Sequence, residues 1–83
     1  MCSLHREAGI GVAEVEEAQI RRATIPRSAE VAALVIADKL GTTSPYIVAP
    51  ATSPTYLVTD GAADPSALSR YRALGVRVIV KEQ

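Results

Sequence analysis

The stretch TYLVTDGAADPSALSRYRALGVRVIV near the C-terminus carries the clearest folding signal in this chain. Thr55–Thr59 is rich in β-branched and aromatic residues, which favours a strand. Asp64 is a good N-cap for a helix over Ser66–Leu74, and Gly75 is a typical residue just past a helix C-terminus. Val76–Val80 then returns as a strand. A strand, a short helix and a second strand of these lengths predict a right-handed parallel crossover.

The earlier part of the chain gives weaker signals. Ala13–Thr24 combines a loose apolar stripe with charged residues on its other faces, which predicts a helix that Pro26 breaks. Val31–Ala37 is a continuous apolar run and predicts a strand covered on both faces, with a buried helix as the alternative. Tyr46–Val48 is a candidate short strand, and Met1–Val12, which has no clear period, is expected to be irregular. The predicted fold is α/β, with a small, mostly parallel β-sheet of three or four strands and flanking helices.

The length and composition limit the classes of protein that fit. A chain of 83 residues allows one domain with a thin core, and without Trp or Phe that core must be aliphatic, so we expect faces that need a partner. Cys2 is the only cysteine, which suits a reducing cytoplasm. Nine basic residues balance nine acidic residues, which gives no general attraction to nucleic acid or to an anionic membrane. The longest apolar run is too short to span a bilayer, and the N-terminus lacks the apolar segment of a secretory signal.

Most catalytic and metal-binding patterns are missing from the sequence. A zinc site needs several ligands at suitable spacing, and Cys2 and His5 alone do not supply one. There is no nucleophile elbow for His5 to serve, no Walker-type phosphate loop and no GxGxxG motif. None of the predicted helices has the basic face of a DNA-recognition helix. We therefore expect a protein that is not an enzyme and has no metal or cofactor, with Cys2 inert.

Lys39 is the strongest candidate for a ligand contact. It follows the apolar Val31–Ala37 run and precedes a Gly–Thr–Thr–Ser loop, at the carboxyl end of a predicted strand, where open α/β sheets bind ligands. A cation with nearby hydroxyls and backbone N–H groups suits a phosphate or a sugar. The alternative interpretation, a solvated loop lysine, is the more common role of this residue type.

Other charged residues have a structural and a functional interpretation. Asp60, at the end of the next predicted strand, is either a ligand carboxylate or, more commonly, the cap of a turn through its own side chain. Glu17 and Arg21 are four residues apart on the predicted helix and are interpreted as a surface ion pair. Arg70 and Arg72 are interpreted as solvated helix positions.

Four motifs follow one another in a recognisable order: EEAQIRRA, EVAALVIADKLG, VAPATSPTYLVTD and ALSRYRALGVRVIV, within Gly9–Val80. This order resembles the C-terminal effector domain of DeoR-type bacterial transcriptional regulators, in which a helix, a strand with a lysine loop, a strand ending in "TD", and a last helix and strand follow in turn. Lys39 and Gly41 match the lysine and glycine of that loop. In an ungapped alignment the aspartate of the family's loop falls on Ile36, and Asp38 takes its role after a deletion of two residues.

The resemblance implies a cytoplasmic repressor or activator of sugar catabolism. Members of the family bind DNA through an N-terminal winged helix-turn-helix, and their C-terminal domain binds a phosphorylated sugar or similar metabolite. Its fold is similar to that of ribose-5-phosphate isomerase. On this basis we expect a homo-oligomeric, partial effector domain that does not bind DNA directly, and in which effector binding shifts the DNA-competent population.

The resemblance also implies a set of ligand contacts. Lys39 would pair with the effector phosphate, and the hydroxyls of Thr42 and Thr43 would add hydrogen bonds. The other candidates are Asp38, Glu17 and Asp60. Two alternatives stay open. The first is a remnant of a sugar-phosphate isomerase, with Glu17 or Asp60 as the general base, and the second is an interaction module without a ligand.

Overall fold

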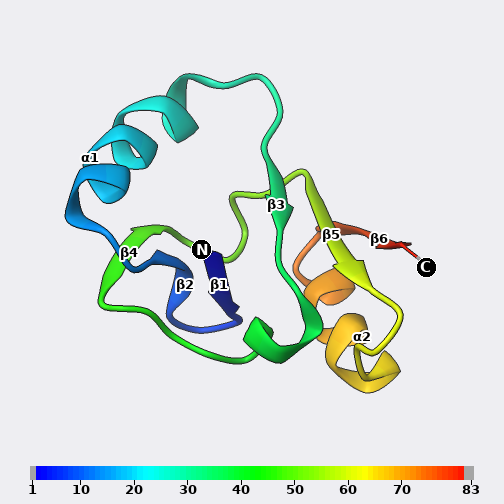
Figure 1. Cartoon of the computed structure of the whole chain (residues 1–83). Helices are drawn as coiled ribbons and strands as arrows, with labels where there is room; N and C mark the ends of the chain where they lie inside the picture. Colours follow the sequence, from blue (N-terminus) through cyan, green and yellow to red (C-terminus); the bar gives the residue numbers. More distant parts are fainter. Residues whose placement is uncertain (1, 82–83) are drawn as a thin grey trace.

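The structure, a computed structural model, describes residues 2–81 of the chain. It contains two three-stranded sheets, one antiparallel and one parallel, and a helix is associated with each (Figure 1). The antiparallel sheet has the order β1–β2–β4, with strands at Cys2–His5, Gly9–Val12 and Tyr46–Ala49. The parallel sheet has the order β3–β5–β6, with strands at Ala32–Leu34, Tyr56–Asp60 and Arg77–Lys81. The helices are α1 (Val15–Thr24) and α2 (Pro65–Ala73), and the two 3-10 turns are η1 (Ile25–Arg27) and η2 (Ala37–Lys39).

The predicted C-terminal strand–helix–strand unit is confirmed. β5 and β6 pair in parallel, and α2 lies between them in the chain. Asp64 caps α2, because its Oδ1 accepts a hydrogen bond from the backbone N–H of Ser66 at 3.0 Å. Gly75 has a φ of +89° just past the helix, a conformation that glycine adopts without strain. Local capping chemistry therefore sets both ends of this helix.

The N-terminal segment is a β-hairpin, so the expectation of an irregular segment is wrong for its described part. β1 and β2 pair antiparallel, and His5 Nδ1 closes the turn by accepting hydrogen bonds from the N–H groups of Glu7 and Ala8, both at 3.1 Å. Glycine is needed where the strands crowd their neighbours: a Cβ at Gly11 would lie 2.7 Å from the Ser3 hydroxyl. Each strand has only four residues, and β2 contains two glycines, so the sequence shows no clear period here although pairing makes the strands regular.

The sheet arrangement also differs from the prediction. Tyr46–Val48 is confirmed as a strand within β4, but β4 pairs antiparallel with β2 and does not join the parallel strands. The described chain therefore has two small sheets of opposite type in place of one mostly parallel sheet. The α/β class is confirmed. Pairing partners depend on contacts between distant segments, which the local sequence does not specify.

β3 is a three-residue strand within the predicted Val31–Ala37 run, and one of its faces is uncovered. Ala33 and Val35 are buried, whereas Leu34 is 68% exposed and Ile36 is 48% exposed. The prediction of a strand covered on both faces is therefore wrong for the described residues. Apolar composition shows what a strand is able to bury, but the remaining elements decide whether anything covers it.

Helix α1 packs on the antiparallel sheet, next to β4 and β2. It begins at Val15, two residues after the predicted start, and ends at Thr24 as predicted, with Pro26 in the following η1 turn. Ala18 is its one buried residue. Arg22 ties the helix to β4, because its Nε and Nη2 both donate to the Ile47 carbonyl oxygen, at 2.9 and 2.8 Å.

The core lies between the two sheets and α2. Leu4 of β1 and Leu57 of β5 have no exposed surface, and the buried hydrophobic side chains are aliphatic apart from Tyr71 of α2, as the composition predicted. The Tyr71 hydroxyl donates to the Leu4 carbonyl oxygen at 3.3 Å, which links α2 to the antiparallel sheet. The backbone N–H of Gly41 donates to the same oxygen at 2.7 Å. The loop after η2 is therefore anchored to the first strand.

Candidate ligand-binding site

The carboxyl ends of the parallel strands gather several of the predicted site residues. β5 ends at Asp60, β6 ends at Lys81, and these two residues are paired in register. The chain leaves β3 at the same edge and forms the η2 turn, which contains Asp38 and Lys39. Open α/β sheets bind ligands at this edge. Lys39 therefore lies in the turn that follows β3, as the sequence predicted, and its contact with a ligand stays a prediction.

Asp60 joins the ends of β5 and β3. Its Oδ2 accepts a hydrogen bond from the N–H of Ala37, the first residue of η2, and its Oδ1 accepts one from the N–H of Ala62, both at 2.9 Å. The bond to Ala62 confirms the turn-capping role that the sequence favoured for this aspartate. The backbone N–H of Ala37, followed by that of Ala62, lowers the pKa of the Asp60 carboxyl below its usual value.

The Lys39 turn is held by backbone contacts. The Thr42 hydroxyl donates to the Lys39 carbonyl oxygen at 2.8 Å, and the Thr42 N–H lies 3.4 Å from the same oxygen. Gly41 has a φ of +80°, which suits glycine in this tight loop. The side chains of Asp38, Lys39 and Thr43 are exposed. Because the Thr42 proton is used within the turn, only the oxygen of that hydroxyl is left to meet a ligand, as an acceptor.

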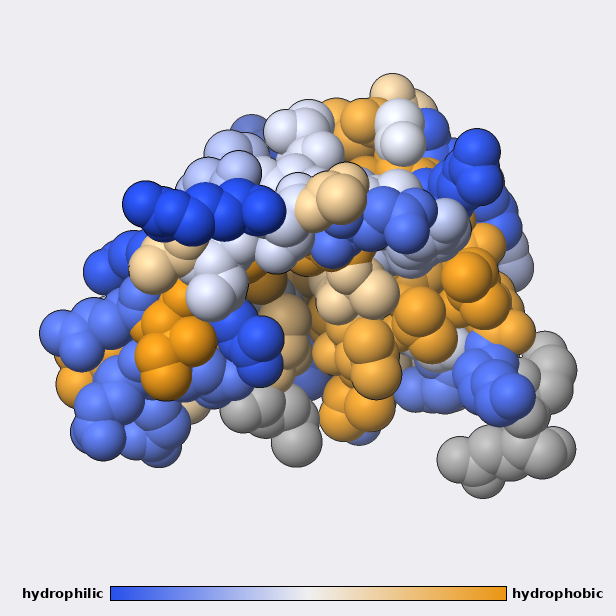
Figure 2. All heavy atoms as spheres, turned by 90° about the horizontal axis from the view of Figure 1, so that it is seen from above, coloured by the Kyte–Doolittle hydropathy of each residue, from blue (hydrophilic) through white to orange (hydrophobic). Residues whose placement is uncertain are grey.

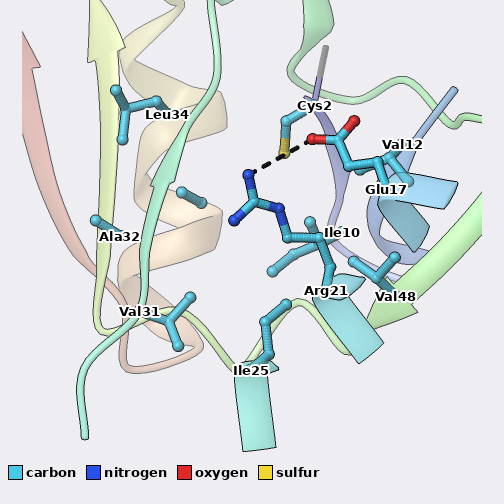
Figure 3. A pocket seen from close by; sticks show the side chains of 11 residues that line it. Cys2, Ile10, Val12, Glu17, Arg21, Ile25, Val31, Ala32, Leu34 and Val48 are labelled. Atoms are coloured by element: carbon cyan, nitrogen blue, oxygen red, sulfur yellow. Dashed lines mark ion pairs between the residues drawn. The ribbon is translucent and has the colours of Figure 1, made fainter. Parts of the chain in front are cut away.

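Glu17 lies in a different place from the Lys39 turn. It lines a cavity of about 280 Å³ between α1, β2 and the free edge of β3, whose walls are mainly aliphatic (Figure 3). Arg21 Nη2 lies 3.6 Å from Glu17 Oε2, so the predicted ion pair is confirmed. Burial, followed by the Glu17 charge, raises the pKa of the Cys2 thiol, which lines the same cavity. A raised pKa keeps this thiol protonated near neutral pH, as expected for an inert cysteine.

Two residues at the carboxyl edge were not predicted from the sequence. Lys81 lies opposite Asp60 and adds a second exposed cation, and the parallel register of the predicted crossover was the signal that would have located it. Thr59 is buried, and its hydroxyl has no hydrogen-bond partner among residues 2–81. A buried polar group without a partner is costly and is uncommon in native structures. The alternation of buried positions along LVTD places Thr59 on the inner face with Leu57.

The remaining candidates have structural roles or are solvated. His5 is used in the hairpin turn, and Arg70 and Arg72 are exposed on α2, as predicted. Over residues 2–81 there is no group of three or more His, Cys, Asp or Glu side chains that could hold a metal ion. Within the same range, no helix combines the length and the apolar character needed to cross a membrane.

The hydrogen bonds of Asp60 lead to a pH prediction for Asp60→Asn. Since the carboxyl has a lower pKa in the folded state than in the unfolded state, its stabilising effect is present above the unfolded pKa of about 3.9 and is lost as the pH falls through the folded value. Asp60→Asn should therefore be less stable than the wild type at pH 7 and should differ less from it at pH 2. Urea unfolding at both pH values measures this. Asp38→Asn, one residue past Ala37 on the exposed turn, is the control and should stay close to the wild type. Equal losses in Asp60→Asn at pH 7 and pH 2 would contradict the assignment.

Comparison with known proteins gives no match: no family model, curated protein or solved structure shows significant similarity to this chain.

Proposed function

We propose that this chain is the effector-binding part of a sugar-responsive transcriptional regulator of the DeoR type. The proposed ligand is a phosphorylated sugar or a related metabolite, bound at the carboxyl edge of the parallel sheet. The observation that carries the proposal is the hydrogen bond from Ala37 N–H to Asp60 Oδ2, at 2.9 Å. It fixes the turn that bears Lys39 beside the end of the neighbouring strand, where ligands of open α/β sheets bind.

The arrangement of the turn suits an anionic ligand. Lys39 presents an exposed ammonium group from a turn whose backbone is held by Thr42 and, through Gly41, by Leu4. A preorganised turn lowers the entropy cost of binding, because fewer groups have to be ordered. Lys81 lies at the same edge and can add a second charge-assisted contact to a phosphate. The two proposed cations thus come from the η2 turn and from the end of β6.

The other predicted contacts receive more specific roles in this proposal. Asp38 and Thr43 are exposed near Lys39 in sequence and are available for sugar hydroxyls. Thr42 and Asp60 shape the turn through their bonds to backbone groups, so their effect on the ligand is indirect. Glu17 contributes to the separate α1 cavity and makes no contact with the effector.

Regulation by this site would act through a longer protein. The proposed effector shifts the populations of the conformations or assemblies of the whole regulator. This shift changes the affinity of a separate DNA-binding domain for the operator. Such coupling requires that the ligand has a different affinity for the two states. The chain itself binds the metabolite and makes no contact with DNA.

Thermal unfolding with a panel of sugar phosphates tests the proposal. A ligand that binds only the folded state adds about 2.7 kcal/mol of stability at a hundredfold excess over its dissociation constant, so one compound should raise the midpoint. Lys39→Ala should remove that rise, because it deletes the cation that meets the phosphate. Arg72→Ala, which removes an exposed cation from α2, is the matched control and should keep the rise.

Inorganic phosphate at the same concentration separates recognition of the sugar from general anion binding. The proposal fails if no compound raises the midpoint of a cooperative transition. It also fails if Lys39→Ala responds as strongly as the wild type.

A further inference from the structure

The parallel sheet leaves one face uncovered. Ala33 and Leu57 point into the core shared with α2, so the alternate residues of each strand point to the opposite face. On that face, Leu34 of β3, Val58 of β5 and Ile79 of β6 are direct neighbours in register. Leu34 is 68% exposed and Ile79 is 47% exposed. Figure 2 shows hydrophobic side chains gathered in the right half of that view of the molecule.

An uncovered face of this kind is unusual for a parallel sheet. All-parallel sheets occur almost only where both faces are covered, because their strands are apolar on both sides. Val58 is half-buried between the exposed Leu34 and Ile79, and a contiguous apolar patch on the surface is typical of a site that binds another molecule. We call Leu34, Val58 and Ile79 the open-face row, and we expect another molecule to cover it.

Charged groups flank the open-face row in an ordered way. Arg77 and Lys81 lie on β6, on either side of Ile79 and on the same face. At the opposite edge of the sheet, Glu30 precedes β3 and Asp38 follows it. The Tyr56 hydroxyl donates to Glu30 Oε2 at 3.0 Å, and Tyr56 belongs to the uncovered face, which places the Glu30 carboxylate there. Strand β6 is thus basic and the start of β3 is acidic at Glu30, whereas the turn after β3 carries both Asp38 and Lys39.

The basic edge of one copy of this face can therefore pair with the acidic edge of a second copy. We propose that the open face binds a second copy of this chain through a two-fold axis that runs parallel to the strands. Such an axis places β6 of each copy over β3 of the other, so that Leu34 meets Ile79 while Arg77 faces Glu30. A two-fold axis across the strands would stack β6 on β6 and oppose like charges, which disfavours that orientation.

The proposed dimer agrees with the general rules for symmetric interfaces. A two-fold interface requires one patch that complements its own copy, and a single open face here carries both the cations and the acids. Face-to-face sheets pack with their strands nearly aligned, as this axis demands. The two Lys39 turns then lie at the same end of the dimer. The open-face row itself contains none of the proposed effector contacts, although two of the flanking charges, Lys81 and Asp38, also belong to the proposed effector site.

Sedimentation velocity across about 1 µM to 1 mM chain tests the dimer, with circular dichroism to confirm that each variant is folded. The wild type should form dimers as its concentration rises. Leu34→Asp should weaken association at least about tenfold, because it places a charge at the centre of the interface. Ile20→Asp is the matched control: Ile20 is 60% exposed on α1, which packs on the antiparallel sheet, so its association should equal that of the wild type.

A charge-exchange experiment tests the orientation. The double variant Arg77→Glu with Lys81→Glu should not self-associate, and neither should Glu30→Lys with Asp38→Lys. An equimolar mixture of the two should form a heterodimer, because opposite charges then face each other across the axis. A wild type that stays monomeric at 1 mM overturns the proposal and leaves the face to a different partner. Dimers of Leu34→Asp as strong as those of the wild type, or a mixture that stays monomeric, overturn it as well.

Discussion

Gly9→Ala should destabilise the fold by about 2–5 kcal/mol. Gly9 has a φ of +105°, a conformation in which a Cβ is strained, and the added Cβ would collide with the carbonyl oxygen of Ala49. That carbonyl belongs to β4, which pairs with β2 next to this position. Relief of the collision would separate the two strands and open the antiparallel sheet. Chemical unfolding followed by circular dichroism measures the loss.

Gly75→Ala separates the two causes of this loss. Gly75 also has a positive φ, of +89°, but a Cβ there would meet no atom within 4 Å. Its substitution should cost only the backbone strain, about 1 kcal/mol. If Gly9→Ala costs no more than Gly75→Ala, then β2 and β4 do not approach as closely at Gly9 as the structure shows.

Leu57→Ala should destabilise the chain by about 2–5 kcal/mol. Leu57 has no exposed surface and lies in the central strand of the parallel sheet, paired with Ala33 on one side and Val78 on the other. Few large side chains are available to fill the resulting cavity, because the core of this small domain is thin. A domain of this size has only a few kcal/mol of net stability, so much of the protein should be unfolded at 25 °C.

Ile20→Ala is the matched control for Leu57→Ala. Ile20 is 60% exposed on α1, and alanine favours a helix more than isoleucine does. Its substitution should change the free energy of unfolding by less than about 0.5 kcal/mol. Similar losses in the two variants would show that Leu57 is not the centre of the core.

The predictions that succeeded depend on short stretches of sequence. Asp64 and Gly75 set the ends of α2 through contacts with residues beside them, and the strands on either side have strong β propensity. The turn-capping role of Asp60 succeeded for the same reason, since Ala62 is two residues away. Its bond to Ala37, which lies 23 residues away, could not be inferred locally.

The predictions that failed depend on which distant segments meet. The hairpin of β1 and β2 was missed because its glycines lower local strand propensity, while the space between paired strands demands them. Glu17 was grouped with Lys39, but α1 packs on the antiparallel sheet and carries Glu17 to a separate cavity. Lys81 was overlooked until the parallel register placed it opposite Asp60.

The sequence alone therefore determined the α/β class, the C-terminal strand–helix–strand unit and an aliphatic core, because capping, turn chemistry and side-chain type act over a few residues. The tertiary structure alone decided that the strands divide into two sheets, that Asp60 holds the Lys39 turn, and that one face of the parallel sheet stays uncovered. These outcomes follow from the pairing of segments far apart in the chain, where burial and backbone hydrogen bonding outweigh local preference.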